Sequence, residues 1–169
     1  MSDPSRAVIH FYSVSGEYGC FSNFSRHPIY LGGKQWRTSE HYFQARKFKG
    51  SEHEETVRLC KTPRQAAEMG RSRKLPLRRD WERVKDQVML EAVRAKFSQH
   101  ADLRAVLLGT GDALLVERTE KDSYWGDGGD GSGRNRLGEI LMSVREELRR
   151  AESSAGAVSE RMKDEEESV

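Results

Sequence analysis

The chain has 169 residues, of which 36% are hydrophobic and 33% are charged, and its formal net charge is +2. This length suits one domain with a core of its own. No apolar run approaches the roughly 20 residues that a membrane-spanning helix needs, and the first residues lack the basic and apolar regions of a secretory signal. We therefore expect a cytoplasmic protein with no membrane partner. Cys20 and Cys60 lack metal or redox spacing, which favours two reduced thiols.

Charge is distributed unevenly along the chain. Residues 151–169 hold six acidic and two basic side chains, so this segment carries −4 and the rest of the chain carries +6. The segment is rich in Ser, Ala and Glu, which predicts a disordered or weakly helical tail outside the functional unit. A body of +6 favours anionic ligands such as phosphates. Charge alone does not separate a phosphate-sugar pocket from a nucleic-acid surface.

Short strands are predicted at three places. Residues 8–13 are β-branched and aromatic, as is typical of a strand. Residues 28–31 and 34–36 flank Gly32-Gly33 and predict a hairpin, because two glycines between apolar arms are a tight-turn signal. Another strand is expected at Leu114–Glu117.

The remaining segments have helical patterns with recognisable capping residues. The expected helices run from Thr38 or Ser39 to about Lys49, from Ser51 (with Glu54 as a capping-box partner) to Cys60, from Thr62 to Gly70, from Asp80 to about Phe97, from Asp102 to Leu108, and from Leu137 to Leu148. The helix after Asp80 is expected to be the longest. Strands do not alternate regularly with helices, which argues against a parallel βαβ architecture. The prediction is a predominantly helical, single-domain α+β fold with a small antiparallel sheet.

The segment Tyr124–Gly138 contains six of the fifteen glycines. Ordering glycine costs much backbone entropy, so ordered loops of this composition usually bring backbone close to a ligand or need positive φ. A flexible linker is the alternative, but linkers are typically Ser-rich and would lack the Trp125 indole and the Arg/Asn cluster at 134–136. We interpret the segment as part of a ligand site.

Glu40, Gln44 and Lys47 fall on one side of a helix, at i, i+4 and i+7. Spacing alone favours a solvated face, whereas the flanking aromatic residues and the adjacent chain reversal favour the wall of a polar pocket. His41 lies about 100° further round the helix, and we interpret it as structural. The basic run 71–79, interrupted by a proline, is either a solvated charge run or a phosphate clamp.

Several of these segments agree in order and spacing with one known family. The agreement is carried by Phe21-Ser22-Asn23-Phe24, Trp36-x-Thr38-Ser39-Glu40-His41-Tyr42-Phe43-Gln44-Ala45-x-Lys47-Phe48, Leu115-Val116-Glu117, Trp125-Gly126-Asp127-Gly128 and Asn135-Arg136-Leu137-Gly138. On these motifs the chain resembles the NADAR family in its bacterial YbiA-like branch. The resemblance covers residues 8–150. It implies one N-glycosidase domain there, with an N-terminal extension at 1–7 and the acidic tail at 151–169 outside it.

The resemblance implies a hydrolase acting on early riboflavin intermediates, the ribosylaminopyrimidine 5′-phosphates. The products are ribose 5-phosphate and a pyrimidine base, the partner is a small phosphoribosyl molecule, and no metal or redox cofactor is implied. One alternative is an ADP-ribosyl hydrolase that removes ADP-ribose from guanine, for which nucleic acid becomes a partner. Another is a non-catalytic module that binds nucleotides or ADP-ribose. A basic nucleic-acid-binding domain would leave Glu40 and the glycine-rich loop without a task.

Breaking a bond between C1′ and nitrogen develops positive charge on the sugar, and a fixed carboxylate stabilises that charge. Glu40 is the first candidate. The resemblance implies a lysine that captures the ribose as an imine, either Lys47 or Lys34, and Lys47 shares the Glu40 stripe. Asp127 is expected to contact ribose hydroxyls or to assist the leaving base, and Trp125 to stack on the base. The other expected substrate contacts are Asn23, Gln44, Arg71, Arg73, Arg78, Gly126, Gly128 and Asn135.

Overall fold

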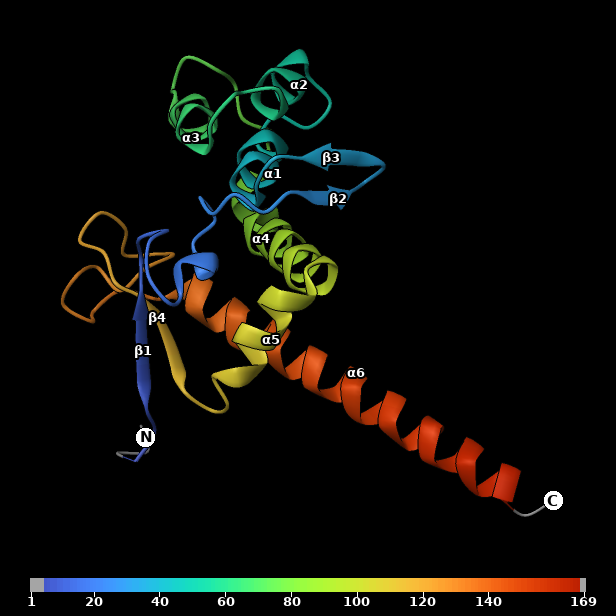
Figure 1. The fold of residues 1–169 in the computed structure, drawn as a ribbon. Coiled ribbons are helices and arrows are strands. Elements are labelled where there is room, and N and C mark those ends of the chain that lie inside the picture. The colour runs from blue at the N-terminus through green and yellow to red at the C-terminus, as the bar shows by residue number, and fades with distance from the viewer. Residues whose placement is uncertain (1–4, 168–169) are drawn as a thin grey trace.

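In the computed structural model, which describes residues 5–167, short strands form two separate pairs (Figure 1). Strands β2 (Ile29–Leu31) and β3 (Lys34–Trp36) make the expected antiparallel hairpin. Gly32 and Gly33 have φ of 64° and 77°, which a tight hairpin turn of this kind requires and glycine adopts without strain.

The sequence predicted antiparallel pairing alone, and the other strand pair does not follow that prediction. Strand β1 (Val8–Phe11) pairs in parallel with β4 (Leu114–Glu117), in a register that places Val8 opposite Leu114 and Phe11 opposite Glu117. The two strands are separated by about 100 residues of mostly helical chain. Local sequence patterns carry no information on so distant a partner, which is why the parallel pair was not foreseen.

Over residues 5–167 the structure forms a 3₁₀ turn and six α-helices, none of which combines the length and apolar character needed to cross a bilayer. The turn is Gly19–Phe21, and the helices are α1 (Ser39–Arg46), α2 (Glu52–Arg58), α3 (Pro63–Arg71), α4 (Trp81–Gln99), α5 (Ala101–Gly109) and α6 (Arg136–Glu167). Every expected helix is present, and its ends lie within a few residues of the expected ones except at the C-terminal end of α6, which was expected at Leu148 and lies at Glu167. The predominantly helical α+β fold is therefore confirmed.

The capping residues act largely as expected. Thr38 accepts a hydrogen bond from the backbone N–H of His41 at the start of α1, and Thr62 forms a full capping box with Gln65 at the start of α3. Ser51 caps α2 by accepting from the N–H of His53. The Glu54 carboxylate pairs with Arg46 at 3.4 Å, so the capping box expected for α2 is replaced by a link to α1.

Asp80 precedes α4 but does not cap it with its side chain. Its carboxylate accepts two hydrogen bonds from Arg78, at 2.6 and 3.0 Å. Helix α4, with 19 residues, is also not the longest, because α6 has 32.

Helix α6 crosses the body of the molecule and packs on α4, α5 and β4 (Figure 1). Its apolar stripe is buried as the helical spacing predicts: Leu137, Ile140, Leu141, Val144 and Leu148. Beyond residue 150 the helix projects from the body as the red end of the ribbon, and every side chain of 151–166 is exposed.

The backbone of this acidic segment is helical through Glu167, which is the helical one of the two forms expected for it. Its Ala, Glu, Arg and Lys residues are good helix formers, and an existing helix extends without a new nucleus. Where the functional unit ends along α6 stays a prediction.

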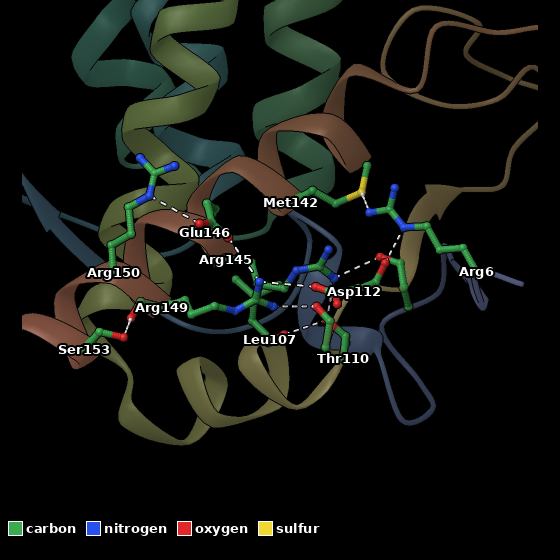
Figure 2. Close-up of polar contacts among 12 residues, drawn as sticks. Arg6, Leu107, Thr110, Asp112, Met142, Arg145, Glu146, Arg149, Arg150 and Ser153 are labelled. Carbon is green, nitrogen blue, oxygen red and sulfur yellow. Dashed lines mark hydrogen bonds and ion pairs between the residues drawn. The ribbon is translucent and has the colours of Figure 1, made fainter. Parts of the chain in front are cut away.

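A buried arginine ties α6 to the chain just before β4 (Figure 2). Nη1 of Arg145 donates to the hydroxyl of Thr110 and to the carbonyl of Ala113, both at 2.9 Å. One turn later, Arg149 pairs with Asp112 at 3.2 Å. These contacts fix the start of β4, and the end of β4 enters the cavity described below.

Two glycines of α6 provide a test of its packing. A Cβ at Gly138 would lie 2.0 Å from the carbonyl oxygen of Leu115, whereas a Cβ at Gly156 meets nothing within 4 Å. We expect Gly138→Ala to lower the free energy of unfolding by roughly 1–3 kcal/mol through overpacking. Gly156→Ala is expected to be neutral or to stabilise by up to about 1 kcal/mol. Urea unfolding measures both variants, and equal effects would contradict the close approach of α6 to β4.

Candidate active site

A cavity of about 850 Å³ lies between α1, α3, the end of β4 and the glycine-rich loop. Its walls come from segments far apart in sequence, namely 12–14, 22–24, α1, α3 and residues 117–125. The volume is in the range of small-molecule sites, roughly 300–1,000 Å³.

Six of the twelve residues expected at the site line this cavity. They are Asn23, Glu40, Gln44, Lys47, Arg71 and Trp125. The stripe that begins at Glu40 is therefore a cavity wall and not a solvated face. The Glu40 carboxyl and the Trp125 indole, separated by 85 positions in the chain, belong to the same cavity.

Glu40 is buried, with 6% of its surface exposed. One carboxylate oxygen accepts a hydrogen bond of 2.7 Å from Nε2 of Gln44, one helical turn further on. Burial raises the pKa of Glu40, whereas the Gln44 hydrogen bond and the charges of Arg71 and Lys47 oppose that rise. The site thus holds this carboxyl in a fixed direction beside two cations.

Lys47 is the C-cap of α1 and is half-buried. Its Nζ donates to the carbonyl of Gly70 at 3.1 Å and lies 5.6 Å from the ring centroid of Phe43. Loss of solvent lowers the pKa of Lys47 to about 8, and Glu40 opposes this. The alternative lysine, Lys34, lies on β3, pairs with Glu55 at 3.1 Å and does not line the cavity.

Gly70 lets α3 approach α1 closely at this point. A Cβ there would lie 1.9 Å from Oε1 of Gln44, an oxygen that is buried without a hydrogen-bond partner. We expect Gly70→Ala to displace Gln44 and weaken its bond to Glu40. Loss of one hydrogen bond to a charged group predicts a kcat lower by roughly 10- to 100-fold.

Steady-state kinetics with a thermal melt tests this prediction. Gly109→Ala is the matched control, because a Cβ at that helical glycine meets nothing within 4 Å. Full activity of a folded Gly70→Ala variant would contradict the role given to Gln44.

Asn23 lies in a turn that a buried lysine anchors. Its side-chain oxygen accepts from the Ser39 hydroxyl at 2.8 Å. Nζ of Lys96 donates to the carbonyls of Cys20 and Ser22, at 2.5 and 3.0 Å, and to the hydroxyl of Ser25 at 2.6 Å. All three N–H groups of this ammonium are used, so Lys96 holds the turn that carries Asn23. Helical spacing in α4 gave no sign of this role.

The other six expected residues do not line the cavity: Arg73, Arg78, Gly126, Asp127, Gly128 and Asn135. Asp127 is buried, and its carboxylate accepts from the backbone N–H groups of Thr119 and Gly129, at 3.0 and 2.8 Å. The Gly129 hydrogen bond, with that of Thr119, lowers the pKa of Asp127. This aspartate organises the loop and does not reach the cavity.

Asn135 clamps the edge of β4. With φ of 51°, it donates to the carbonyl of Leu115 at 2.9 Å and accepts from the N–H of Glu117 at 3.0 Å. Gly126 has no room for a side chain, because a Cβ would lie 2.6 Å from a methyl carbon of Thr119. Gly128 has φ of 73°. Gly126 and Gly128 are thus needed for the close packing and the backbone conformation of the loop, whereas Trp125 of the same loop lines the cavity.

Arg73 and Arg78, which were expected to bind the phosphate, lie outside the cavity. Arg78 is engaged with Asp80, and its backbone N–H donates to the carbonyl of Lys47 at 2.8 Å. Arg73 is exposed on the basic loop. His41 is buried, with its ring nitrogens hydrogen-bonded to the Thr38 hydroxyl and the Cys60 carbonyl, which confirms the structural interpretation.

Five charged residues line the cavity that were not among the expected site residues: Arg64, Glu68, Glu117, Lys121 and Asp122. Burial, with the nearby carboxylate of Asp122, raises the pKa of Glu117 to about 7. Asp122 accepts from the N–H groups of Tyr124 and Trp125, at 2.8 and 2.7 Å, and so positions the indole. Two signals could have pointed to Glu117: its place at the end of the predicted strand, and its place in the motif Leu115-Val116-Glu117, on which the chain resembles the NADAR family.

The NADAR domain model matches residues 10–149 of the chain. The chain belongs to the NADAR family. It is 59% identical over 141 residues to N-glycosidase YbiA of Escherichia coli, covering 83% of this chain and 88% of YbiA. An N-glycosidase of Nostoc punctiforme is 52% identical over 152 residues, covering 88% of this chain and 97% of that protein.

The NMR structure of E. coli YbiA superposes with a TM-score of 0.81 at 57% identity, covering 86% of this chain and 87% of that one. A riboflavin biosynthesis protein of Vibrio vulnificus is 44% identical over 140 residues, covering 83% of this chain and 38% of that longer protein. Family membership and the N-glycosidase relatives identify this NADAR protein as a hydrolase acting on N-glycosyl compounds.

Proposed function

We propose that the protein hydrolyses ribosylaminopyrimidine 5′-phosphates, early intermediates of riboflavin synthesis, to ribose 5-phosphate and a pyrimidine base. The observation that carries the proposal is that Glu40, Lys47 and Trp125 line one cavity. In cleavage of a ribosyl–base bond, a carboxyl can stabilise the positive charge on the sugar, a partly desolvated amine can act as nucleophile, and an indole can stack on the base. The Vibrio relative's name, a riboflavin biosynthesis protein, supports the substrate class.

Glu40 stabilises the positive charge that develops on C1′ and the ring oxygen as the bond to nitrogen breaks. Its orientation is set by Gln44 at 2.7 Å, so the carboxyl does not need to reorganise during the reaction. Lys47, whose pKa is lowered to about 8 by loss of solvent, has a useful fraction of free amine near neutral pH. That amine captures the opened ribose as an imine, which water then hydrolyses.

The 5′-phosphate has cationic partners at the same cavity. Arg64, Arg71 and Lys121 line it, and guanidinium groups are well suited to bind phosphate through paired hydrogen bonds. Trp125 offers a flat face for the pyrimidine, and its ring is braced edge-on by Phe43 at 5.3 Å and Tyr124 at 4.9 Å. The partner is accordingly a small phosphoribosyl molecule.

The test is incubation of the protein with a ribosylaminopyrimidine 5′-phosphate and, in parallel, with ADP-ribosylated guanosine. Mass spectrometry of the products is expected to show ribose 5-phosphate and free pyrimidine in the first reaction at a far higher rate than ADP-ribose in the second. Turnover of the guanosine conjugate alone would replace this proposal by ADP-ribosyl hydrolysis. Tight binding of both compounds without products would show a binding module.

A further inference from the structure

Glu117 lines the cavity, and neither the sequence motifs nor the proposed function has given it a task. Of the other acidic residues without a catalytic role there, Glu68 pairs with Arg64 at 3.2 Å and Asp122 accepts from the backbone N–H of Trp125. Glu117 ends β4, and its backbone is held on both sides. Its N–H donates to Asn135 at 3.0 Å, and its carbonyl accepts from the N–H of Asp127 at 2.8 Å. The side chain, in contrast, lines the cavity, and within residues 5–167 its carboxyl has no hydrogen bond or ion pair to the protein. A rigid backbone thus presents an unengaged carboxyl to the substrate space.

The charges around Glu117 favour its protonated form. Burial raises the pKa of Glu117 to about 7, and the nearby carboxylates of Asp122, Glu40 and Asp127 all act in the same direction. Glu40 is different, because Gln44, Arg71 and Lys47 oppose the effect of its burial. Burial raises the pKa of both carboxyls, but a hydrogen-bond donor and two cations stabilise the charged form of Glu40 alone, whereas the neighbours of Glu117 are carboxylates. Two carboxyls in one site, of which one has its charged form stabilised and the other does not, are typical of sites that use general acid–base catalysis.

We propose that Glu117 is the general acid that delivers a proton to the departing base. This rests on the proposed function, because it requires an N-ribosyl substrate in this cavity. The bond from C1′ to nitrogen breaks with its electron pair going to nitrogen, and the carboxyl proton of Glu117 moves to that nitrogen. The Glu117 carboxylate then takes a proton from the water whose oxygen ends on C1′. The acid is thereby restored, and water is the only co-reactant.

A pyrimidine that leaves through an amino nitrogen needs this proton, since the nitrogen anion is strongly basic. Glu40 is held by Gln44 and faces the developing cation, so its negative form is the useful one. Lys47 acts as a free amine in the proposed function and donates to the Gly70 carbonyl when protonated. Glu117 is therefore the group left to act as the acid.

The experiment compares Glu117→Gln with the wild type on two substrates that differ in their need for a proton. On a ribosylaminopyrimidine 5′-phosphate, kcat is expected to fall on the order of 10²–10⁴-fold. On p-nitrophenyl riboside 5-phosphate, whose phenolate leaves without a proton, the loss is expected to stay below about tenfold. Glu120→Gln, an exposed glutamate three positions further on, is the matched control and should leave both rates unchanged.

The pH profile gives a second readout that a merely structural role would not change. The wild-type rate should fall on the alkaline side as Glu117 loses its proton, and the Glu117→Gln profile should lack this fall. Carboxyl ¹³C NMR of the wild type needs no substitution: one glutamate carboxyl, assigned to Glu117, should titrate near neutral pH. If the Glu117→Gln variant fails to fold, the NMR titration of the wild type tests the proposal instead. A Glu117 carboxyl that titrates with the ordinary acidic pKa of a glutamate would overturn the proposal.

Equal losses on the two substrates, or an unchanged alkaline limb, would overturn the acid role while leaving the proposed function intact. A wild-type protein that cleaves neither riboside overturns the proposed function, and this inference with it. The two failures are thus distinguishable from the wild-type rates alone.

Discussion

Replacement of Glu40 by Gln is expected to lower kcat on a ribosylaminopyrimidine 5′-phosphate by about 10²–10³-fold, the usual cost of removing one electrostatic stabiliser at the reacting centre. Gln keeps the size of the side chain but not the charge that stabilises the sugar cation. KM should change little, because the charge develops only in the transition state. Glu40 is buried and held by the 2.7 Å bond to Gln44, so the wild-type carboxylate is fixed before the reaction begins.

Steady-state kinetics at saturating substrate measures the effect. Glu52→Gln, an exposed glutamate in the first turn of α2, is the control for a simple change of net charge. A Glu40→Gln protein with wild-type kcat and a normal melting temperature would remove the carboxylate from the mechanism. A loss confined to KM would assign Glu40 to substrate binding.

Replacement of Lys47 by Met is expected to lower kcat on the order of 10³-fold or more, as removal of a covalent nucleophile does elsewhere. Met has nearly the same length and suits the contacts with Phe43 and Trp81, so the fold should persist. Treatment of the wild type with substrate and borohydride is expected to leave a reduced ribose 5-phosphate adduct on Lys47, identified by peptide mass spectrometry.

The pH dependence follows from the same amine. Desolvation lowers the pKa of Lys47 to about 8, so the free amine decreases about tenfold for each pH unit below that value. With Glu117 protonated only below its pKa of about 7, the wild-type rate should rise from about pH 6 to about 7, change little up to about 8 and fall above that. The Glu117→Gln variant lacks the fall, so its rate should keep rising towards pH 8. Lys34→Met is the matched control and should retain activity and adduct formation. A borohydride adduct on Lys34, or none on Lys47, would contradict the assignment.

Much of the local structure could be read from the residues. Thr38, Thr62 and the apolar stripe of 137–148 predicted real helix starts and a real buried face, because caps and periodicity act over a few residues. The Gly32-Gly33 turn followed from backbone sterics alone. The stripe from Glu40 to Lys47 followed from helical geometry, and the agreement of its motif with the NADAR family identified the reaction class.

The tertiary structure decided what depends on distant partners. It paired β1 with β4 across about 100 residues, placed Lys47 and not Lys34 at the cavity, and showed that Asp127 and Asn135 organise a loop. It also brought Glu117 into a cavity with Glu40, where mutual repulsion and burial change its protonation. Spacing along a chain records which residues share one element, whereas burial, pKa and hydrogen-bond partners depend on which elements come together.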